Sequence, residues 1–240
     1  MGGLTLSTII ESPEPLGHRN KCEFTFGCDS KNEKSLGFRI SSFRDGVRVE
    51  NPEECPNVPK AMKVVVNKII EFIKASPFEV YDLKSHRGVW RNLFLRYSKR
   101  SKEMLMMFVV SLDSIEVKAW QNECDRLKSA LISLQRFDGI DNEVFRLESG
   151  EEICYTSEDT GESGNLISGI TYQNYDGASV PPSDHPIHIL YGRDYITEKM
   201  LDCEFKISPI AFFQVCNVAK FMTMLLFFSR TLSSLSSSPR

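Results

Sequence analysis

The segment "RNLFLRYSKRSKEMLMMFVVS", residues 91–111, contains two apolar runs separated by a short charged stretch. Each run has the length of an ordinary strand and is rich in bulky apolar residues. The charged residues between the runs are typical of an exposed turn. The segment therefore predicts a β-hairpin with a basic tip.

Two stretches before this hairpin alternate apolar and polar residues with the period of a half-buried strand, at 21–27 and 36–50. Asp45 and Gly46 supply a two-residue hairpin turn within the second stretch. The residues expected on the buried sides are Cys22, Phe24 and Phe26 in the first stretch and Leu36, Phe38 and Ile40 in the second.

Two further stretches have helical periodicity. The first is expected to follow Asn57 as N-cap and to end before Pro77. The second opens with Asp113 and Glu116, which have the spacing of a capping box, and runs to about Gln135. The apolar positions that define the period are Met62, Val65, Val66, Ile69 and Ile73 in the first helix and Ile115, Ala119, Trp120, Leu127 and Leu131 in the second.

Strand patterns return near the end of the chain, at 166–176, 187–192 and 203–215. An acidic stretch with six carboxylates and no Lys or Arg, residues 148–165, is expected to form a flexible loop. The order of strands and helices predicts an α+β fold with a largely antiparallel sheet and two main helices.

The composition is ordinary for a soluble globular chain of 240 residues, with 41% hydrophobic and 25% charged residues. A net charge of −3 provides no global basic field. The seven cysteines form no C-x-x-C pair, and the start of the chain does not resemble a signal peptide. We therefore expect reduced thiols, no metal site and a cytoplasmic or nuclear protein. The apolar run at 221–228 is too short to span a bilayer.

Positive charge is concentrated locally. Residues 84–102 contain seven Lys or Arg and no Asp or Glu, with aromatic residues interleaved. Arg19 and Lys21 stand two positions apart, which places both on one face of a strand. Such cations could contact a phosphate backbone, or they could simply solvate a hairpin tip. The cations of the run are Lys84, Arg87, Arg91, Arg96, Lys99, Arg100 and Lys102.

The segment "ISPIAFFQV", residues 207–215, combines an amide with aromatic rings. Gln214 could donate to and accept from a polar small molecule while Phe212 stacks on a base. A half-buried strand with an exposed amide is the alternative. No complete active site is visible, because Cys216 lacks a nearby base. The four histidines, His18, His86, His185 and His188, lack metal-like spacing with carboxylates.

Six blocks in this order resemble the tRNA (uracil-5-)-methyltransferase family, especially its eukaryotic members. They are "HRNKCEFTFG", "LGFRISSFRDGV", "CPNV", "WRNLFLRYSKRSKE", "YGRDYITEKML" and "FKISPIAFFQV", and the resemblance covers roughly residues 9–215. In that family an α+β RNA-binding domain precedes a Rossmann-like domain, which uses S-adenosylmethionine to methylate carbon 5 of a tRNA uridine. The target base is flipped out of its stack.

The resemblance implies roles for individual residues. Arg19 and Lys21 match basic positions that face tRNA, Phe212 matches an aromatic near the flipped uracil, and Gln214 matches a glutamine that contacts the methyl donor. It also favours RNA contacts for the basic hairpin, through Arg91, Arg96, Lys99 and Arg100. The implied division is a lead-in at 1–17, an α+β RNA-binding domain at 18–206, the start of a link at 207–215, and a divergent apolar then Ser-rich tail at 216–240.

The family pattern stops after "FFQV". The donor loop and the nucleophile loop have no match, so we expect a truncated product without catalytic residues or methyl transfer. Binding of S-adenosylmethionine is expected to be negligible, with tRNA as the partner of a monomer that uses neither membrane nor metal. The alternatives are a stand-alone, non-catalytic RNA-binding module and a non-productive fragment.

Overall fold

The computed structural model of the chain describes residues 15–42, 46–132, 134, 144–146, 152–154, 167–177, 181–182, 184–200 and 203–213. The strands are β1 (Lys21–Cys28), β2 (Lys34–Arg39), β3 (Val49–Glu50), β4 (Trp90–Ser98), β5 (Glu103–Val110), β6 (Val144–Arg146), β7 (Glu152–Cys154), β8 (Ile167–Asn174), β9 (His188–Gly192), β10 (Ile196–Met200) and β11 (Cys203–Ile207). The helices are α1 (Lys60–Lys74) and α2 (Val117–Ile132), and a 3₁₀ turn, η2, spans Pro52–Glu54.

Seven of these strands form one sheet in the order β3-β2-β1-β4-β5-β8-β9. All neighbours in it are antiparallel except β5 and β8, which are parallel. The hairpin predicted from residues 91–111 lies in the middle of this sheet. Two separate pairs, β6–β7 and β10–β11, complete the strands of the described residues. The α+β architecture predicted from the sequence is confirmed.

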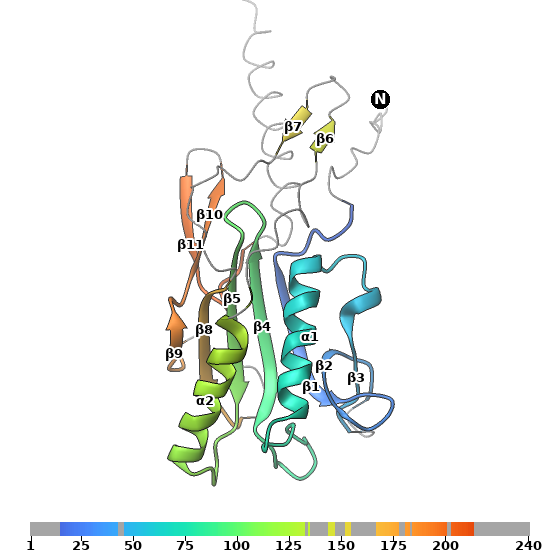
Figure 1. The fold of residues 1–240 in the computed structure, drawn as a ribbon, viewed down its shortest axis with the longest axis vertical. Helices are drawn as coiled ribbons and strands as arrows, with labels where there is room; N and C mark the ends of the chain where they lie inside the picture. The colour runs from blue at the N-terminus through green and yellow to red at the C-terminus, as the bar shows by residue number, and fades with distance from the viewer. Residues whose placement is uncertain are drawn as a thin grey trace, which may run out of the picture.

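Both helices lie against the same face of the sheet (Figure 1). Their apolar sides pack on the side chains of β1, β4 and β5 that point toward them. The centre of this core is Trp90, whose ring lies 5.7 Å from that of Phe26, 6.0 Å from Phe72 on α1 and 5.6 Å from Trp120 on α2. The ring thus joins both helices to the sheet.

The opposite face of the sheet has a different cover. Alternation along β4 directs Leu93 and Leu95 toward the helices and Phe94 away from them. Phe94 forms a small cluster with Met107 and Val109, against which Tyr175, Ile187 and Ile210 pack. Beside it, Leu105 packs with Ile196 of β10 and Ile207 of β11. Irregular segments and a hairpin therefore cover this face.

The helices begin later than the sequence indicated. Pro59 is the N-cap of α1 and makes no side-chain capping bond, so the prediction of Asn57 as cap was wrong. Helix α2 begins at Val117 and not beside Asp113. Ser114 has a φ of 66°, a left-handed conformation that a continuous helix cannot include.

The strand predictions hold at their starts better than at their ends. Ile40 was expected on the buried side but is 65% exposed, because β2 ends at Arg39. The strand predicted at 203–215 ends at Ile207 and continues as irregular chain. Asp45, and the acidic stretch at 148–165 apart from β7, lie outside the described residues. Within the described part of the chain, no helix is long and apolar enough to cross a bilayer.

Candidate nucleic-acid interface

The start of β1 and the end of β4 meet at one end of the sheet. Lys21 stands directly opposite Arg96 in the antiparallel pairing of the two strands. Just before β1, the carbonyl of Asn20 accepts a hydrogen bond of 3.0 Å from the backbone N–H of Tyr97. This pairing brings Lys21 beside the basic turn of the β4–β5 hairpin, although about eighty positions separate them in the sequence. Arg19 precedes β1 and lies beside the Cys22 thiol on the helix side, so the prediction that Arg19 and Lys21 share one face of a strand was wrong.

Two chain segments contribute cations at this end, residues 19–21 and the turn after β4. The backbone at Gly17 has a φ of 57°, and a Cβ there would lie 3.8 Å from Nζ of Lys99, so this turn lies against the hairpin tip. Arg100 follows in the same turn and is exposed. Arg19 donates from Nε to the carbonyl of Lys21 at 3.3 Å, while its backbone N–H donates to the carbonyl of Asn57. We call Arg19, Lys21, Lys99 and Arg100 the cation cluster.

Partial burial affects the ionisation of Lys21, one member of this cluster. Loss of hydration lowers the pKa of Lys21, the nearby Arg96 lowers it further, and Glu23 on the same strand opposes the shift. Nζ of Lys21 lies 5.5 Å from the ring centroid of Phe94, so the ring offers it a cation–π contact. Burial raises the pKa of the Cys22 thiol to about 11 against the opposing effect of Arg19, so this thiol stays protonated at neutral pH.

Arg96 does not present its charge to solvent. Its side chain is 1% exposed, and its guanidinium donates to the carbonyls of Ser208 and Pro209 at 2.9 and 3.2 Å and to that of Ala211. These bonds hold segment 208–211 against the end of β4. The next residue, Phe212, is 93% exposed. The fold thus places Phe212 on the surface, directly after a segment tethered at this end of β4.

Arg91 lies at the other end of β4 and does not join the cluster. It is 7% exposed and donates to the carbonyls of Tyr175 and Gly177, both at 2.6 Å, with its guanidinium 4.3 Å from the ring centroid of Tyr81. The exposed residues Lys84 and Arg87 precede this end of the strand. Since β4 has nine residues, its two ends lie roughly 25 Å apart. The basic run at 84–102 is therefore divided between two ends of the sheet.

The other candidate residues lie elsewhere. Gln214 and Cys216 are outside the described residues. The His86 ring hydrogen-bonds the Tyr81 hydroxyl at 3.0 Å, and the His188 ring stacks on Tyr172 with centroids 4.7 Å apart. Within the described ranges no three His, Cys, Asp or Glu side chains gather as a metal site would require. The histidines thus have local structural partners.

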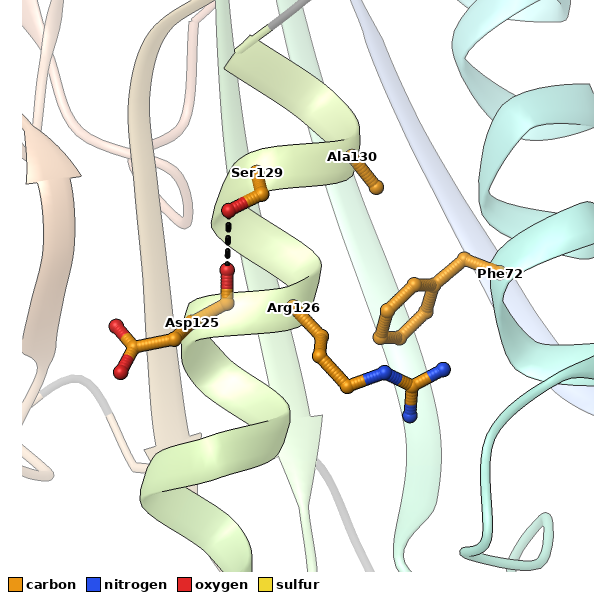
Figure 2. A pocket seen from close by; sticks show the side chains of 5 residues that line it. All are labelled: Phe72, Asp125, Arg126, Ser129 and Ala130. Atoms are coloured by element: carbon orange, nitrogen blue, oxygen red, sulfur yellow. Dashed lines mark hydrogen bonds between the residues drawn. The ribbon is translucent and has the colours of Figure 1, made fainter.

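One hollow lies on the helix side of the sheet, between α1 and α2 (Figure 2). Its lining residues are Phe72, Asp125, Arg126, Ser129 and Ala130. The Arg126 guanidinium lies 5.4 Å from the ring centroid of Phe72 and is paired at 2.5 Å with the buried carboxylate of Glu123. Segment 208–213 packs on the opposite face of the sheet from this hollow.

Sequence patterns did not predict the contacts that place β10. Arg193 forms an ion pair with Glu103 at the start of β5, and Glu103 also accepts from the backbone N–H of Thr197 at 2.8 Å. The Ser101 hydroxyl donates to the Thr197 carbonyl at 3.1 Å. These partners are about ninety residues apart in the chain, a separation across which residue spacing carries no information.

Comparison with known proteins identifies the family. Zinc finger CCCH domain-containing protein 24 of Arabidopsis thaliana is 32% identical over 90% of this chain. tRNA (uracil-5-)-methyltransferase homolog A of Mus musculus is 30% identical over 88% of it. The chain belongs to the tRNA (uracil-5-)-methyltransferase family. It spans 28% and 30% of the lengths of these two relatives. No family model matches the chain.

A solved structure has the same fold. The tRNA (uracil-54, C5)-methyltransferase of Pyrococcus abyssi, in complex with S-adenosyl-L-homocysteine, matches with a TM-score of 0.54 at 19% identity. The match covers 90% of this chain and 42% of the archaeal one. The α+β arrangement is thus shared between this chain and the archaeal member of the family.

Proposed function

We propose that the chain provides the tRNA-binding part of a tRNA uridine C5-methyltransferase and acts in the cytoplasm or nucleus. The observation that carries the proposal is that Arg19, Lys21 and Lys99 lie at the end of the sheet where Arg96 tethers the segment preceding the exposed Phe212. Cations that neutralise phosphates supply most of the affinity for RNA, and an exposed aromatic ring can stack on a base that has left its helix. Family membership and the shared fold support the same role.

A binding assay with an unmodified tRNA transcript tests this proposal. Fluorescence anisotropy across a salt series should give an affinity that falls steeply with salt for the full 240-residue chain. Arg19→Ala and Lys21→Ala should each weaken binding and lower the salt slope by about 1.

The exposed cations at the other end of β4 provide matched controls. Lys84→Ala and Arg87→Ala each remove one positive charge, as Arg19→Ala and Lys21→Ala do, but they leave the cation cluster unchanged. We expect affinity and salt slope to stay at the wild-type values for both. Equal losses at the two ends would contradict a localised RNA surface and indicate non-specific attraction.

We propose S-adenosylmethionine as the cofactor of the family reaction and negligible binding of it to this chain. Gln214 alone would contribute about one hydrogen bond, worth roughly 1 kcal/mol. Millimolar affinity already requires about −4 kcal/mol. Calorimetry with S-adenosylmethionine should therefore detect no micromolar binding to this chain, and incubation with labelled donor and tRNA should transfer no methyl group.

A further inference from the structure

Arg96 fixes a segment that belongs to no strand. Strand β11 ends at Ile207, and the carbonyls of residues 208, 209 and 211 accept their hydrogen bonds from the Arg96 guanidinium. A guanidinium carries five N–H donors in a rigid plane, so one side chain can satisfy several carbonyls at fixed directions. A single side chain more than 110 positions earlier in the chain thus binds three carbonyls of the segment.

This arrangement buries a positive charge with neutral partners. Burial lowers the pKa of Arg96 to about 10, and among the described residues no carboxylate forms an ion pair with it. A buried charge without a counter-ion is a poor source of stability. A role in placing the segment accounts for its presence better than a contribution to folding does.

The residues on either side of Phe212 are anchored. Ile210 packs on the cluster of Phe94, Met107 and Val109, and the Phe213 ring lies 5.8 Å from that of Phe205. Between these anchors the Phe212 ring projects into solvent. Lys21 also contacts this cluster, through the ring of Phe94. Phe212 and Lys21 are thus held on one common support.

We propose that Arg96 is a positioning residue for RNA recognition, which holds segment 208–213 so that the Phe212 ring faces a nucleobase beside the cation cluster. The inference rests on the proposed function. It assigns Arg96 no contact with RNA, unlike the sequence-based expectation. Its action is on the backbone carbonyls that precede Phe212.

Two substitutions separate positioning from direct contact. Arg96→Lys keeps the charge but loses the planar fork, and Arg96→Gln loses the charge. If Arg96 positions Phe212, both should weaken tRNA binding by about tenfold, the size expected for one lost base stack, with the salt slope unchanged. Retained affinity in Arg96→Lys together with a slope lower by about 1 in Arg96→Gln would overturn the proposal in favour of a phosphate contact.

Arg91→Lys is the matched control. Arg91 lies on the same strand, is also buried and also donates to carbonyls of an irregular segment, but that segment lies at the far end of β4. We expect Arg91→Lys to destabilise the chain without changing its affinity for tRNA. A loss equal to that of Arg96→Lys would show that any destabilisation weakens binding, and would overturn the proposal.

A double substitution tests whether the effect passes through Phe212. Phe212→Ala should weaken binding about tenfold by itself. Adding Arg96→Lys to Phe212→Ala should then weaken it no further, because the positioned ring is already absent. Additive losses would contradict the proposal.

Hydrogen exchange gives a readout that needs no RNA. Amides in the peptide covering 203–213 should exchange faster in Arg96→Lys than in the wild-type chain, and at the wild-type rate in Arg91→Lys. Unchanged exchange in Arg96→Lys would overturn the positioning role even if tRNA binds. If exchange is faster in Arg96→Lys but the wild-type chain does not bind tRNA, the proposed function is refuted. The inference that Arg96 holds segment 208–213 would still stand.

A third variant applies if both Arg96 variants fail to fold. Ile210→Ala loosens the same segment from Phe94 and leaves every cation in place. It should lower tRNA affinity at an unchanged salt slope. Wild-type affinity in Ile210→Ala would overturn the proposal.

Discussion

Strand β4 carries a buried arginine near each end, and both arginines bind carbonyls of a segment distant in sequence. Arg91 holds residues 175 and 177, and Arg96 holds residues 208, 209 and 211. At the Arg91 end the guanidinium itself lies against the rings of Tyr81 and Tyr175. At the Arg96 end the ring that follows the tethered carbonyls, Phe212, stays exposed.

The two ends differ in whether an aromatic ring beside the tethered segment remains exposed to solvent. Both ends have exposed cations nearby, so charge alone does not distinguish them. Only the Arg96 end combines cations from two segments with a solvent-facing aromatic ring, among the residues described. Stacking and phosphate contact together are what recognition of an unstacked nucleotide requires. The comparison therefore favours the Arg96 end of the strand for the RNA recognition that we propose.

The largest expected effect comes from the core that both ends share. Trp90 is fully buried against rings from both helices and from β1 and β5. Trp90→Ala should lower the free energy of unfolding by about 4 kcal/mol, measured by urea denaturation. Retention of wild-type stability would show that the two helices do not dock on the sheet through this ring. The two ends of β4 would then not share one common core.

The second effect separates stability from binding at the Arg91 end. Arg91→Gln removes two charge-assisted hydrogen bonds and leaves the carbonyls of Tyr175 and Gly177 without their donor. We expect a loss of about 3 kcal/mol in urea denaturation. The tRNA affinity of the folded protein should remain unchanged at a temperature where both proteins are folded. Weaker binding of tRNA by Arg91→Gln at that temperature would indicate an RNA contact at the Arg91 end as well.

The sequence predicted the central elements because their patterns are local. Cys22, Phe24 and Phe26 alternate in β1 and are all buried, and Trp120 and Leu127 define the buried side of α2. Periodicity reports which side of an element is apolar, which is enough for the sheet and its two helices. The start of α2 was missed because Ser114 adopts a left-handed conformation that its residue type does not signal.

The candidate site was only partly accessible to the same reasoning. The cations at 19, 21, 99 and 100 could be chosen from charge and spacing, and pairing of β1 with β4 brings them together. Arg91 and Arg96 have the same residue type, yet their partners are backbone carbonyls 84 to 115 positions away. Residue spacing does not show whether a cation is buried against carbonyls distant in the chain. The sequence therefore could not distinguish buried arginines from exposed ones.

A smaller effect is expected from charge reversal at the two ends. Lys99→Glu places a carboxylate in the cation cluster, and Lys84→Glu places one in the exposed loop before β4. Lys99→Glu should weaken tRNA binding by about tenfold at low salt, an effect that diminishes as salt screens the charge. Lys84→Glu changes net charge equally and should leave the affinity within about twofold. If both reversals weaken binding alike, net charge rather than the cluster governs the interaction.

The smallest effect concerns Glu23, which lies on the same strand as Lys21. Its side chain is exposed, yet the sheet withdraws part of its hydration, which raises its pKa above 4.5 and favours the neutral form in the fold. The ionised form therefore costs stability at neutral pH, so Glu23→Gln should be more stable there by about 0.3 kcal/mol after screening by solvent.

As the pH falls through the folded-state pKa of Glu23 toward 4.5, the folded wild type takes up its proton before the unfolded chain does. Wild-type stability should then rise relative to Glu23→Gln, and the difference between the two should close. Urea denaturation at a series of pH values from 7 to about 4 measures this. A difference that widens toward low pH would mean that the carboxylate is stabilised by Lys21, as in a salt bridge. The cation cluster would then contain a built-in counter-ion, and its advantage over the Arg91 end in attracting phosphates would shrink.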